Sequence, residues 1–465
     1  MKSKALFISI LLLVSNVMSY TKEQWKSKTV YQVLTDRFSR TDGSTKACSD
    51  LSDYCGGTYR GLINNLDYIQ GMGFDAVWVS PIIKNLDKGY HGYWATDLYS
   101  LNDHFGTEQD FKDLVKAIHS RGMWIMVGVV ANHVGPVPND DFSQINPFNS
   151  PEHYHDYCII NPDDFSQDQW RVENCRLAGL PDLKQENSFV KDTLTSWVSD
   201  LVKKYDIDGL RIDTCPEVPK DFWTDFQNAA GVYAVGEVFD GRVDYVADYQ
   251  NHVEGILNYP LRFLIYDVWH DGNSFYGLKQ RLEDNKKAFK DVNLLGTFVD
   301  NHDNARFLYQ NTNKNGFKAA LLFGIFTEGI PIVYYGSEQA YGGGNDPNNR
   351  EQLWTNMDTS SDIYQFIKAA LKTRKDNEVW NSESVERYID DNFYAFSRGN
   401  VLVALTNTDG NVVRNVNYLP FSEGQQVCNI FDMADCATVN SGQITIDLTG
   451  YKSKVYVPSQ FKVSQ

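Results

Sequence analysis

Residues 188–213 read SFVKDTLTSWVSDLVKKYDIDGLRID, and this stretch decides the fold. Its first part, Ser188–Lys204, places apolar residues at helical spacing. Its last part, Gly209–Ile212, is a short buried-strand pattern that ends at Asp213. A helix that leads directly into a short apolar strand is the repeating unit of parallel α/β folds.

The same unit recurs along the chain. Helical patterns also occupy Glu108–Arg121, Gly277–Phe289 and Gly316–Thr327. Eight apolar, β-branched runs are predicted as strands: Val30–Leu34, Ala76–Val79, Trp124–Val130, Gly209–Ile212, Tyr233–Val238, Gly255–Leu257, Leu294–Val299 and Ile330–Tyr335. This alternation predicts an α/β fold, a (β/α)8 TIM barrel. A doubly wound open sheet is the alternative, but it would need an early Gly-rich phosphate turn, which the sequence lacks.

Two segments interrupt the alternation. Residues 132–185 are rich in Pro, Asn and Asp with little periodicity, and we interpret them as a loop-rich domain inserted after the third strand. Residues 381–465 carry short alternating runs, which predict a C-terminal antiparallel β-sandwich domain. The runs predicted as its strands are Phe393–Arg398, Val401–Asn407, Gln426–Phe431, Gln443–Leu448 and Lys454–Val457. The barrel then comprises residues 20–131 and 186–380.

The N-terminus has the pattern of a secretory signal peptide. Lys2 and Lys4 precede the apolar run Ala5–Val14, and a cut after Ser19 would follow small or modest residues. The run is short for a membrane span. We therefore expect residues 1–19 to be removed and the protein to be secreted, to the extracellular space or the lumen of a secretory or digestive compartment.

The composition points to a neutral partner. The formal net charge is −17 and aromatic residues make up 14% of the 465 residues. A dispersed acidic surface repels nucleic acid and anionic membranes, so we expect neither as a partner. Aromatic side chains in excess of core needs suit a surface that stacks on sugar rings. We expect a monomer.

The seven cysteines fit an oxidising compartment. Cys48 and Cys55 bracket a polar turn, Cys158 and Cys175 bracket part of the insertion, and Cys428 and Cys436 lie close together near the C-terminus. We predict these three bridges, each closing a short loop. Cys215 is then left free and is expected to be buried near the fourth strand.

Three carboxylates stand at the ends of apolar runs. Asp213 follows Gly209–Ile212, Glu237 ends the run from Tyr233, and Asp303 ends the run from Leu295. Burying unpaired charges is costly, so three at strand ends require a reason. The carboxyl ends of barrel strands form the active-site face, and paired carboxylates are what acid-catalysed glycoside hydrolysis uses. The alternative is that Arg211 and Asp213 merely pair with each other.

Six motifs stand out along the chain: Tyr90-His-Gly-Tyr-Trp94, Val129-Val-Ala-Asn-His133, Leu180-Pro-Asp-Leu183, Gly209-Leu-Arg-Ile-Asp213, Gly236-Glu-Val238 and Phe298-Val-Asp-Asn-His-Asp303. Together they resemble the α-amylase family of glycoside hydrolases, closest to its secreted fungal-type members. They occur in the family's order and at the expected strand ends. The resemblance covers nearly all of the chain after residue 19.

The resemblance implies roles for particular residues. Asp213 would be the nucleophile, Glu237 the general acid/base and Asp303 the stabiliser of the transition state. The implied substrate-binding residues are His91, Tyr93, Trp94, His133, Arg211, Glu217, Gly241, His302, Asp346 and Arg350. For Asp346 and Arg350, a simple surface ion pair is the alternative.

The resemblance also implies a structural Ca²⁺ ion as cofactor. The family's metal positions fall on Asn132, Glu173, Asp182 and the backbone carbonyl of Glu217. Oxygen ligands of these kinds are what Ca²⁺ takes in proteins. Such an ion would tie the insertion to the barrel.

Two positions depart from the family pattern. Gly128 replaces an Asp that normally pairs with the arginine equivalent to Arg211, so Arg211 is expected to lose a charged partner. Pro216-Glu217 replaces Lys-His just after the nucleophile, on the leaving-group side. The second change puts the product pattern and any transglycosylation in question.

The resemblance implies a secreted, endo-acting α-amylase that hydrolyses internal α-1,4 bonds of starch, glycogen or maltooligosaccharides with retention of configuration. Leu180-Pro-Asp-Leu183 favours this over the family's α-glucosidases and α-1,6-cutting members. An exo-acting maltogenic or transglycosylating enzyme is one alternative. A catalytically inactive family member that acts as a binding protein is another.

Overall fold

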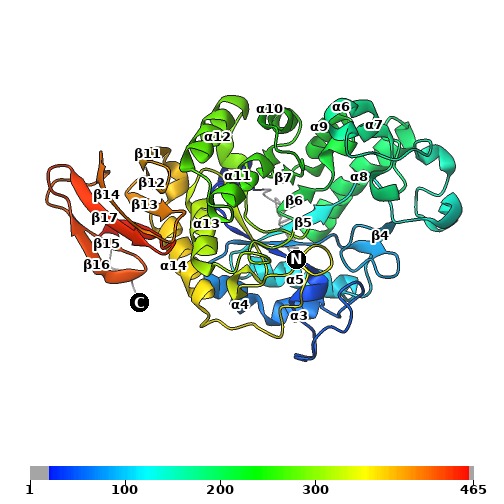
Figure 1. Ribbon diagram of the computed structural model, residues 1–465. Coiled ribbons are helices and arrows are strands. Elements are labelled where there is room, and N and C mark those ends of the chain that lie inside the picture. The colour runs from blue at the N-terminus through cyan, green and yellow to red at the C-terminus, as the bar shows by residue number, and fades with distance from the viewer. Residues whose placement is uncertain (1–19, 460–465) are drawn as a thin grey trace, which may run out of the picture.

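The computed structural model describes residues 20–459. The predicted signal peptide, residues 1–19, lies outside the described residues. Among residues 20–459, none of the helices combines the length and the apolar character that crossing a membrane would need. Figure 1 shows the barrel in the middle of the molecule, with the C-terminal strands at one end and helices α6 and α7 at the opposite end.

The barrel is an eight-stranded parallel sheet, as predicted. Its strands are β1 (Val30–Val33), β2 (Ala76–Val79), β5 (Trp124–Val129), β6 (Gly209–Ile212), β7 (Tyr233–Gly236), β8 (Gly255–Ile256), β9 (Gly296–Thr297) and β10 (Ile330–Tyr334). They hydrogen-bond in the order β8-β7-β6-β5-β2-β1-β10-β9, and a parallel bridge between Leu257 and Gly296 joins the two ends. Every run predicted as a strand is present, and several are one or two residues shorter at an end.

Helices surround this sheet. They are α1 (Lys22–Trp25), α2 (Thr35–Phe38), α3 (Tyr59–Asn64), α4 (Leu66–Met72), α5 (Glu108–His119), α8 (Ser188–Tyr205), α9 (Lys220–Ala230), α10 (Val243–Asp248), α11 (Tyr259–Trp269), α12 (Phe275–Ala288), α13 (Lys314–Phe326) and α14 (Asp362–Asp376). The predicted helices correspond to α5, α8, α12 and α13.

Strand alternation builds two apolar layers. In β2, Ala76 and Trp78 belong to one cluster of buried residues, whereas Val77 and Val79 belong to another. Since successive side chains of a strand point to opposite faces, the first cluster fills the barrel and the second packs under the helices. The two layers hold the strand ends, and therefore the residues that follow them, in fixed positions.

A hairpin that sequence analysis did not predict follows β2. Strands β3 (Ile83–Asn85) and β4 (Ala95–Leu101) pair antiparallel, and the loop between them carries His91, Tyr93 and Trp94. The segment between β5 and α8 contains only short helices, including α6 (Asp164–Gln167) and α7 (Gln169–Asn174). The predicted bounds of the inserted domain, residues 132–185, stay a prediction.

The C-terminal part forms two antiparallel sheets. One has six strands in the order β11 (Ser384–Ile389), β12 (Phe393–Arg398), β13 (Val401–Thr406), β18 (Lys454–Pro458), β15 (Gln426–Asn429) and β16 (Asp432–Thr438). The other pairs β14 (Asn411–Asn417) with β17 (Gln443–Thr449). Phe393 and Leu402 of the first sheet share a buried cluster with Val412 and Ile446 of the second, which makes the predicted β-sandwich.

The predicted disulfides are present. Cys48 is bonded to Cys55, Cys158 to Cys175, and Cys428 to Cys436. Cys215 is free and fully buried, as expected.

Candidate active site

The three predicted carboxylates follow three barrel strands at their carboxyl ends. Asp213 follows β6, Glu237 follows β7, and Asp303 lies in the loop after β9. Ile212 and Gly236 are partners in the parallel ladder, so Asp213 and Glu237 leave neighbouring strands side by side. All three line one cavity of about 670 Å³.

Arg211 joins two of these carboxylates. Its Nη1 contacts Oδ1 of Asp213, and its Nη2 lies 2.7 Å from Oε1 of Glu237. The guanidinium is buried, with 1% of its surface exposed, in the barrel interior near the rings of Trp78 and Tyr93. Arg211 therefore pairs with both acids, and the alternative of a simple Arg211–Asp213 pair does not describe the site.

Burial gives Glu237 an unusual proton affinity. It raises the pKa of Glu237 to about 8, even though the Arg211 charge acts in the opposite direction. The hydroxyl of Tyr259 donates to Oε1 at 3.2 Å, and the backbone N–H of Thr214 donates to Oε2 at 3.3 Å. At neutral pH the Glu237 carboxyl can thus hold a proton beside the Asp213 carboxylate.

His302 is held by two fixed partners. The side-chain amide of Gln32 lies 2.9 Å from Nδ1, and the hydroxyl of Tyr93 lies 2.7 Å from Nε2. Oδ2 of Asp303 is 3.3 Å from the same Nε2. Burial holds the pKa of His302 well below its usual range, so the ring is a neutral hydrogen-bonding group at the cavity.

Arg350 occupies the other side of Asp303. Its Nη2 is 3.6 Å from Oδ1 of Asp303, and its Nη1 is 3.1 Å from Oδ1 of Asp346. The hydroxyl of Tyr90 lies within 3.2 Å of both Asp346 and Arg350. Because the Arg350 side chain is only 8% exposed and also reaches Asp303, it forms more than a surface ion pair with Asp346.

The cavity gathers nearly all of the predicted substrate residues. Those that line it are His91, Tyr93, Trp94, His133, Glu217, His302, Asp346 and Arg350. Its opposite wall is apolar and comes from the segment after β5, including Ile160, Phe165 and Leu180. Gly241 is not among the lining residues. Its carbonyl oxygen accepts a hydrogen bond from Arg281 at 3.2 Å.

Gly128 has a steric reason to lack a side chain. It is the ladder partner of Arg211, so both residues face the barrel interior. A Cβ atom at Gly128 would lie 2.9 Å from Cδ and 3.2 Å from the backbone nitrogen of Pro81. The Pro81 ring thus takes the space of a side chain here, and Nε of Arg211 is buried with no hydrogen-bond partner among residues 20–459. Arg211 was expected to lack a charged partner on the side of Gly128, and its unpaired Nε agrees with that expectation. Arg211 nevertheless pairs with two carboxylates.

Three of the four predicted metal positions converge. One terminal atom of the Asn132 amide lies 2.9 Å from Oδ1 of Asp182 and 3.1 Å from the carbonyl oxygen of Glu217. If that atom is nitrogen, it donates to both oxygens. If it is oxygen, three oxygens face one another around a space that suits a cation, since ligands at roughly 2.3–2.6 Å from one Ca²⁺ ion lie about 3 Å apart.

The neighbouring histidine favours the second orientation. Nε2 of His133 faces the carbonyl oxygen of Tyr93 at 3.2 Å and therefore carries the ring proton. Burial lowers the pKa of His133, so the ring is neutral and its Nδ1 is an acceptor. Nδ1 lies 3.2 Å from the Asn132 amide, which must then present its NH2 group to His133 and its oxygen to Asp182.

Glu173, the fourth predicted metal position, is connected to the region of the other three through one side chain, Gln169. Its carboxylate accepts a hydrogen bond from Gln169 at 2.9 Å, and the same amide donates to the carbonyl oxygen of Pro216 at 3.0 Å. Among residues 20–459, no group of three or more His, Cys, Asp or Glu side chains is arranged as a metal site. The candidate donors are accordingly one amide, one or two carboxylates and a backbone carbonyl, which are oxygen ligands of the kind Ca²⁺ accepts.

Sequence reasoning missed three residues of the site. Gln32 fixes His302, Tyr259 bonds to Glu237, and Phe239 lines the cavity. Gln32 gave a usable signal, because a polar residue in the apolar strand Val30–Val33 needs a buried partner. Tyr259 and Phe239 gave none, since Tyr259 is the first residue of α11 and Phe239 lies in the loop after β7.

A parallel barrel whose strand ends gather paired carboxylic acids around an open cavity has the arrangement that glycoside hydrolases use. A family model described as "Alpha amylase, catalytic domain" matches residues 32–392. The chain belongs to the α-amylase family.

Curated relatives from yeasts match over most of their length. Alpha-amylase 2 of Schwanniomyces occidentalis is 38% identical over 462 residues, which cover 94% of this chain and 90% of the relative. The alpha-amylase of Saccharomycopsis fibuligera is 37% identical over 461 residues, covering 94% and 93%.

Solved structures of alpha-amylases are similar to this chain over nearly its whole length. An alpha-amylase from Malbranchea cinnamomea superposes with a TM-score of 0.92 at 41% identity, covering 96% of this chain and 99% of that one. An alpha-amylase from Geobacillus thermoleovorans, complexed with acarbose, has a TM-score of 0.84 at 31% identity and covers 93% and 98%.

Proposed function

We propose that this enzyme is a secreted α-amylase that hydrolyses internal α-1,4 bonds of starch or glycogen with retention of configuration. The observation that carries the proposal is the pair of acids joined by Arg211: the Asp213 and Glu237 carboxyl groups contact the same guanidinium, and burial raises the pKa of Glu237 to about 8. A retaining glycosidase needs one ionised and one protonated carboxyl group close together. The yeast relatives are alpha-amylases, which is consistent with starch as substrate.

In this mechanism Asp213 attacks the anomeric carbon while Glu237 gives its proton to the departing glycosidic oxygen. The bond between sugar and Asp213 forms as the bond to the leaving group breaks. Glu237, now a carboxylate, then takes a proton from water, and the water oxygen displaces Asp213. Arg211 stays between the two acids and offsets the negative charge that passes from one to the other.

The remaining groups of the cavity would hold the sugar. Asp303 would stabilise the transition state, with His302 and Arg350 fixing its carboxylate. His133 and His302 would bond sugar hydroxyls, while His91, Tyr93 and Trp94 present ring faces to the same sugar. Asp346 would contact a more distant glucose unit. Glu217 lines the cavity beside Pro216, on the proposed leaving-group side.

We propose Ca²⁺ as a structural cofactor, held by Asn132, Asp182 and the carbonyl of Glu217, with Glu173 nearby. Its binding would fix the start of the insertion against the exit of β6. The ion would supply charge neutralisation for facing oxygens and take no part in the chemistry.

Product analysis tests the proposal. Incubation with starch should release a range of oligosaccharides early, and NMR of the first products should show the α-anomer. An enzyme that releases only maltose from chain ends, or builds longer products from maltotriose, would be the exo-acting or transglycosylating alternative. Absence of any product would favour a binding protein. The carboxyl groups of Asp213 and Glu237 should lie about 5–5.5 Å apart in a crystal structure, the retaining separation.

A further inference from the structure

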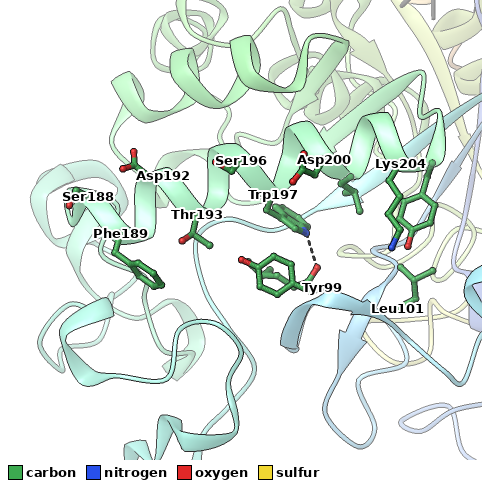
Figure 2. A pocket seen from close by; sticks show the side chains of 13 residues that line it. Tyr99, Leu101, Ser188, Phe189, Asp192, Thr193, Ser196, Trp197, Asp200 and Lys204 are labelled. Atoms are coloured by element: carbon green, nitrogen blue, oxygen red, sulfur yellow. Dashed lines mark hydrogen bonds between the residues drawn. The ribbon is translucent and has the colours of Figure 1, made fainter. Parts of the chain in front are cut away.

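A second groove lies outside the candidate active site. It has a volume of about 720 Å³ and runs between helix α8 and strand β4. Figure 2 shows Tyr99 and Leu101 of β4 below the helix, with Phe189, Thr193 and Trp197 of α8 directed toward that side. The mechanism proposed above uses none of these residues.

Two ridges of α8 form one side of the groove. Residues four apart lie on the same helix face. One ridge is aromatic and apolar, with Phe189, Trp197 and Tyr205 eight residues apart, and the other carries the polar groups Asp192, Ser196 and Asp200. From 188 to 204 the helix extends about 24 Å, the length of several sugar rings.

The floor of the groove is fixed and its rims are open. Trp197 is only 4% exposed, and its Nε1 donates to the carbonyl oxygen of Leu98 at 2.8 Å. Tyr99 and Phe189 are 58% and 47% exposed. Large aromatic rings exposed to this extent on both sides of one groove indicate a binding surface.

The polar ridge is available to a neutral ligand. The lysines nearby are engaged elsewhere, Lys191 with Asp225 at 2.5 Å and Lys204 with Glu108 at 2.9 Å. Within residues 20–459, Asp192 and Asp200 have no ion-pair partner, so they are free to accept hydrogen bonds. An anion would be repelled by them, whereas a ligand rich in hydroxyl groups would satisfy them.

The size favours a narrow chain over a protein partner. A volume of about 720 Å³ is in the range of small-ligand sites, roughly 300–1,000 Å³. The groove also begins on the strand that leaves the candidate active site. Tyr99 lies five residues after Trp94, about 17 Å along an extended strand.

We propose that this groove is a second binding site for α-glucan chains. A ring of Tyr99 or Phe189 would stack on the apolar face of a glucose unit, while Asp192, Ser196 and Asp200 accept its hydroxyl groups. A chain held here raises the local concentration of the same polymer at the cavity. The inference rests on the proposed function for the choice of ligand.

The test separates binding in the groove from hydrolysis. In an Asp213→Asn background, which should not consume the ligand, mobility in native gels containing glycogen measures glucan binding. Tyr99→Ala/Phe189→Ala should weaken retardation several-fold, and Ser196→Arg, which obstructs the groove without removing a ring, should do the same. Tyr276→Ala, which removes a tyrosine of 50% exposure on α12, should have no effect.

Kinetics give the second readout. In the otherwise unchanged enzyme, the groove variants should raise KM for soluble starch several-fold and leave kcat/KM for maltotriose unchanged, because a three-unit substrate cannot span both sites. If the groove variants have the same retardation and the same KM for starch as the parent, the proposal is overturned, and a protein partner becomes the better candidate for the groove. An enzyme that hydrolyses neither substrate yet is retarded through the groove would overturn the proposed function alone.

Discussion

At the scale of the residue, the site depends on two carboxylic acids that share one buried cation. Asp213 and Glu237 both contact Arg211. Glu237 also accepts a hydrogen bond from the hydroxyl of Tyr259, and burial raises the pKa of Glu237 to about 8. The apolar runs before these residues were sufficient to predict their positions at strand ends.

Glu237→Gln should greatly lower activity and yet stabilise the protein at alkaline pH. Loss of a general acid typically costs about 10²–10⁴-fold in rate. A carboxyl whose pKa is raised on folding gives stability that is full below its unfolded pKa and is lost as the pH rises through about 8. Gln cannot ionise, so the melting temperature of the variant relative to the parent should increase between pH 5 and pH 9.

Exposed Glu283→Gln on α12 is the matched control for this prediction, and it should show no such trend. A Glu237→Gln variant that keeps parental activity, or one whose relative melting temperature does not depend on pH, would contradict the assignment.

Gly128→Asp should destabilise the protein. The new Cβ would meet the Pro81 ring and its backbone nitrogen, and overpacking of this kind costs about 1–3 kcal/mol. Adding Pro81→Ala removes the ring atoms and leaves room for a carboxylate beside the orphaned Nε of Arg211. Thermal unfolding should therefore rank the parent first, the double variant second and Gly128→Asp last. A single variant as stable as the parent would show that Pro81 moves freely.

At the scale of the element, sequence patterns predicted buried strands well and exposed ones poorly. The barrel strands and β12 are buried at every position, and all were found. Strands β11 and β16 have no buried position and β14 has only two, so their apolar signal is weak, and all three were missed. The β3–β4 hairpin was missed because its register is irregular at two points.

Removal of calcium should loosen the segment after β5 before the barrel unfolds. An ion that binds only the folded state adds about 2.7 kcal/mol at a hundred times its dissociation constant. EDTA should therefore lower the melting temperature and speed hydrogen exchange first within residues 132–185. An unchanged melting temperature and unchanged activity would contradict the calcium proposal.

Asp182→Asn should make the melting temperature insensitive to EDTA, because the variant has lost a charged oxygen ligand. Asp163→Asn changes an exposed carboxylate in the same segment and should keep the full response.

At the scale of the whole molecule, sequence analysis predicted the parts in their correct order but not how closely they pack. The indole of Trp269 donates to the carbonyl oxygen of Thr406 at 3.1 Å, and Arg398 donates to that of Thr327 at 2.8 Å. Phe396 packs against Phe323, with ring centroids 6.0 Å apart. The first sheet of the sandwich thus shares one apolar core with the barrel helices. Contacts between segments so distant in sequence leave no local pattern.

The barrel and the sandwich should therefore unfold together. Scanning calorimetry should give a single transition, and a chain ending at residue 380 should be insoluble or poorly stable, because it would expose the faces of α11 and α13 that the sandwich covers. A soluble, active fragment without the sandwich would contradict this expectation.

The three disulfides have a consequence for how the chain is made. They join cysteines 7, 17 and 8 positions apart, and in each case the partner is the next cysteine along the sequence. Since synthesis runs from the N-terminus, Cys55 is the first thiol that Cys48 can meet, and once these two are joined Cys175 is the first unpaired thiol that Cys158 can meet. Cys215 is the one extra thiol, and its complete burial removes it from exchange once the barrel has closed. Oxidation can accordingly proceed segment by segment during synthesis, with a single interval, between the emergence of Cys215 and barrel closure, in which a competing thiol is exposed.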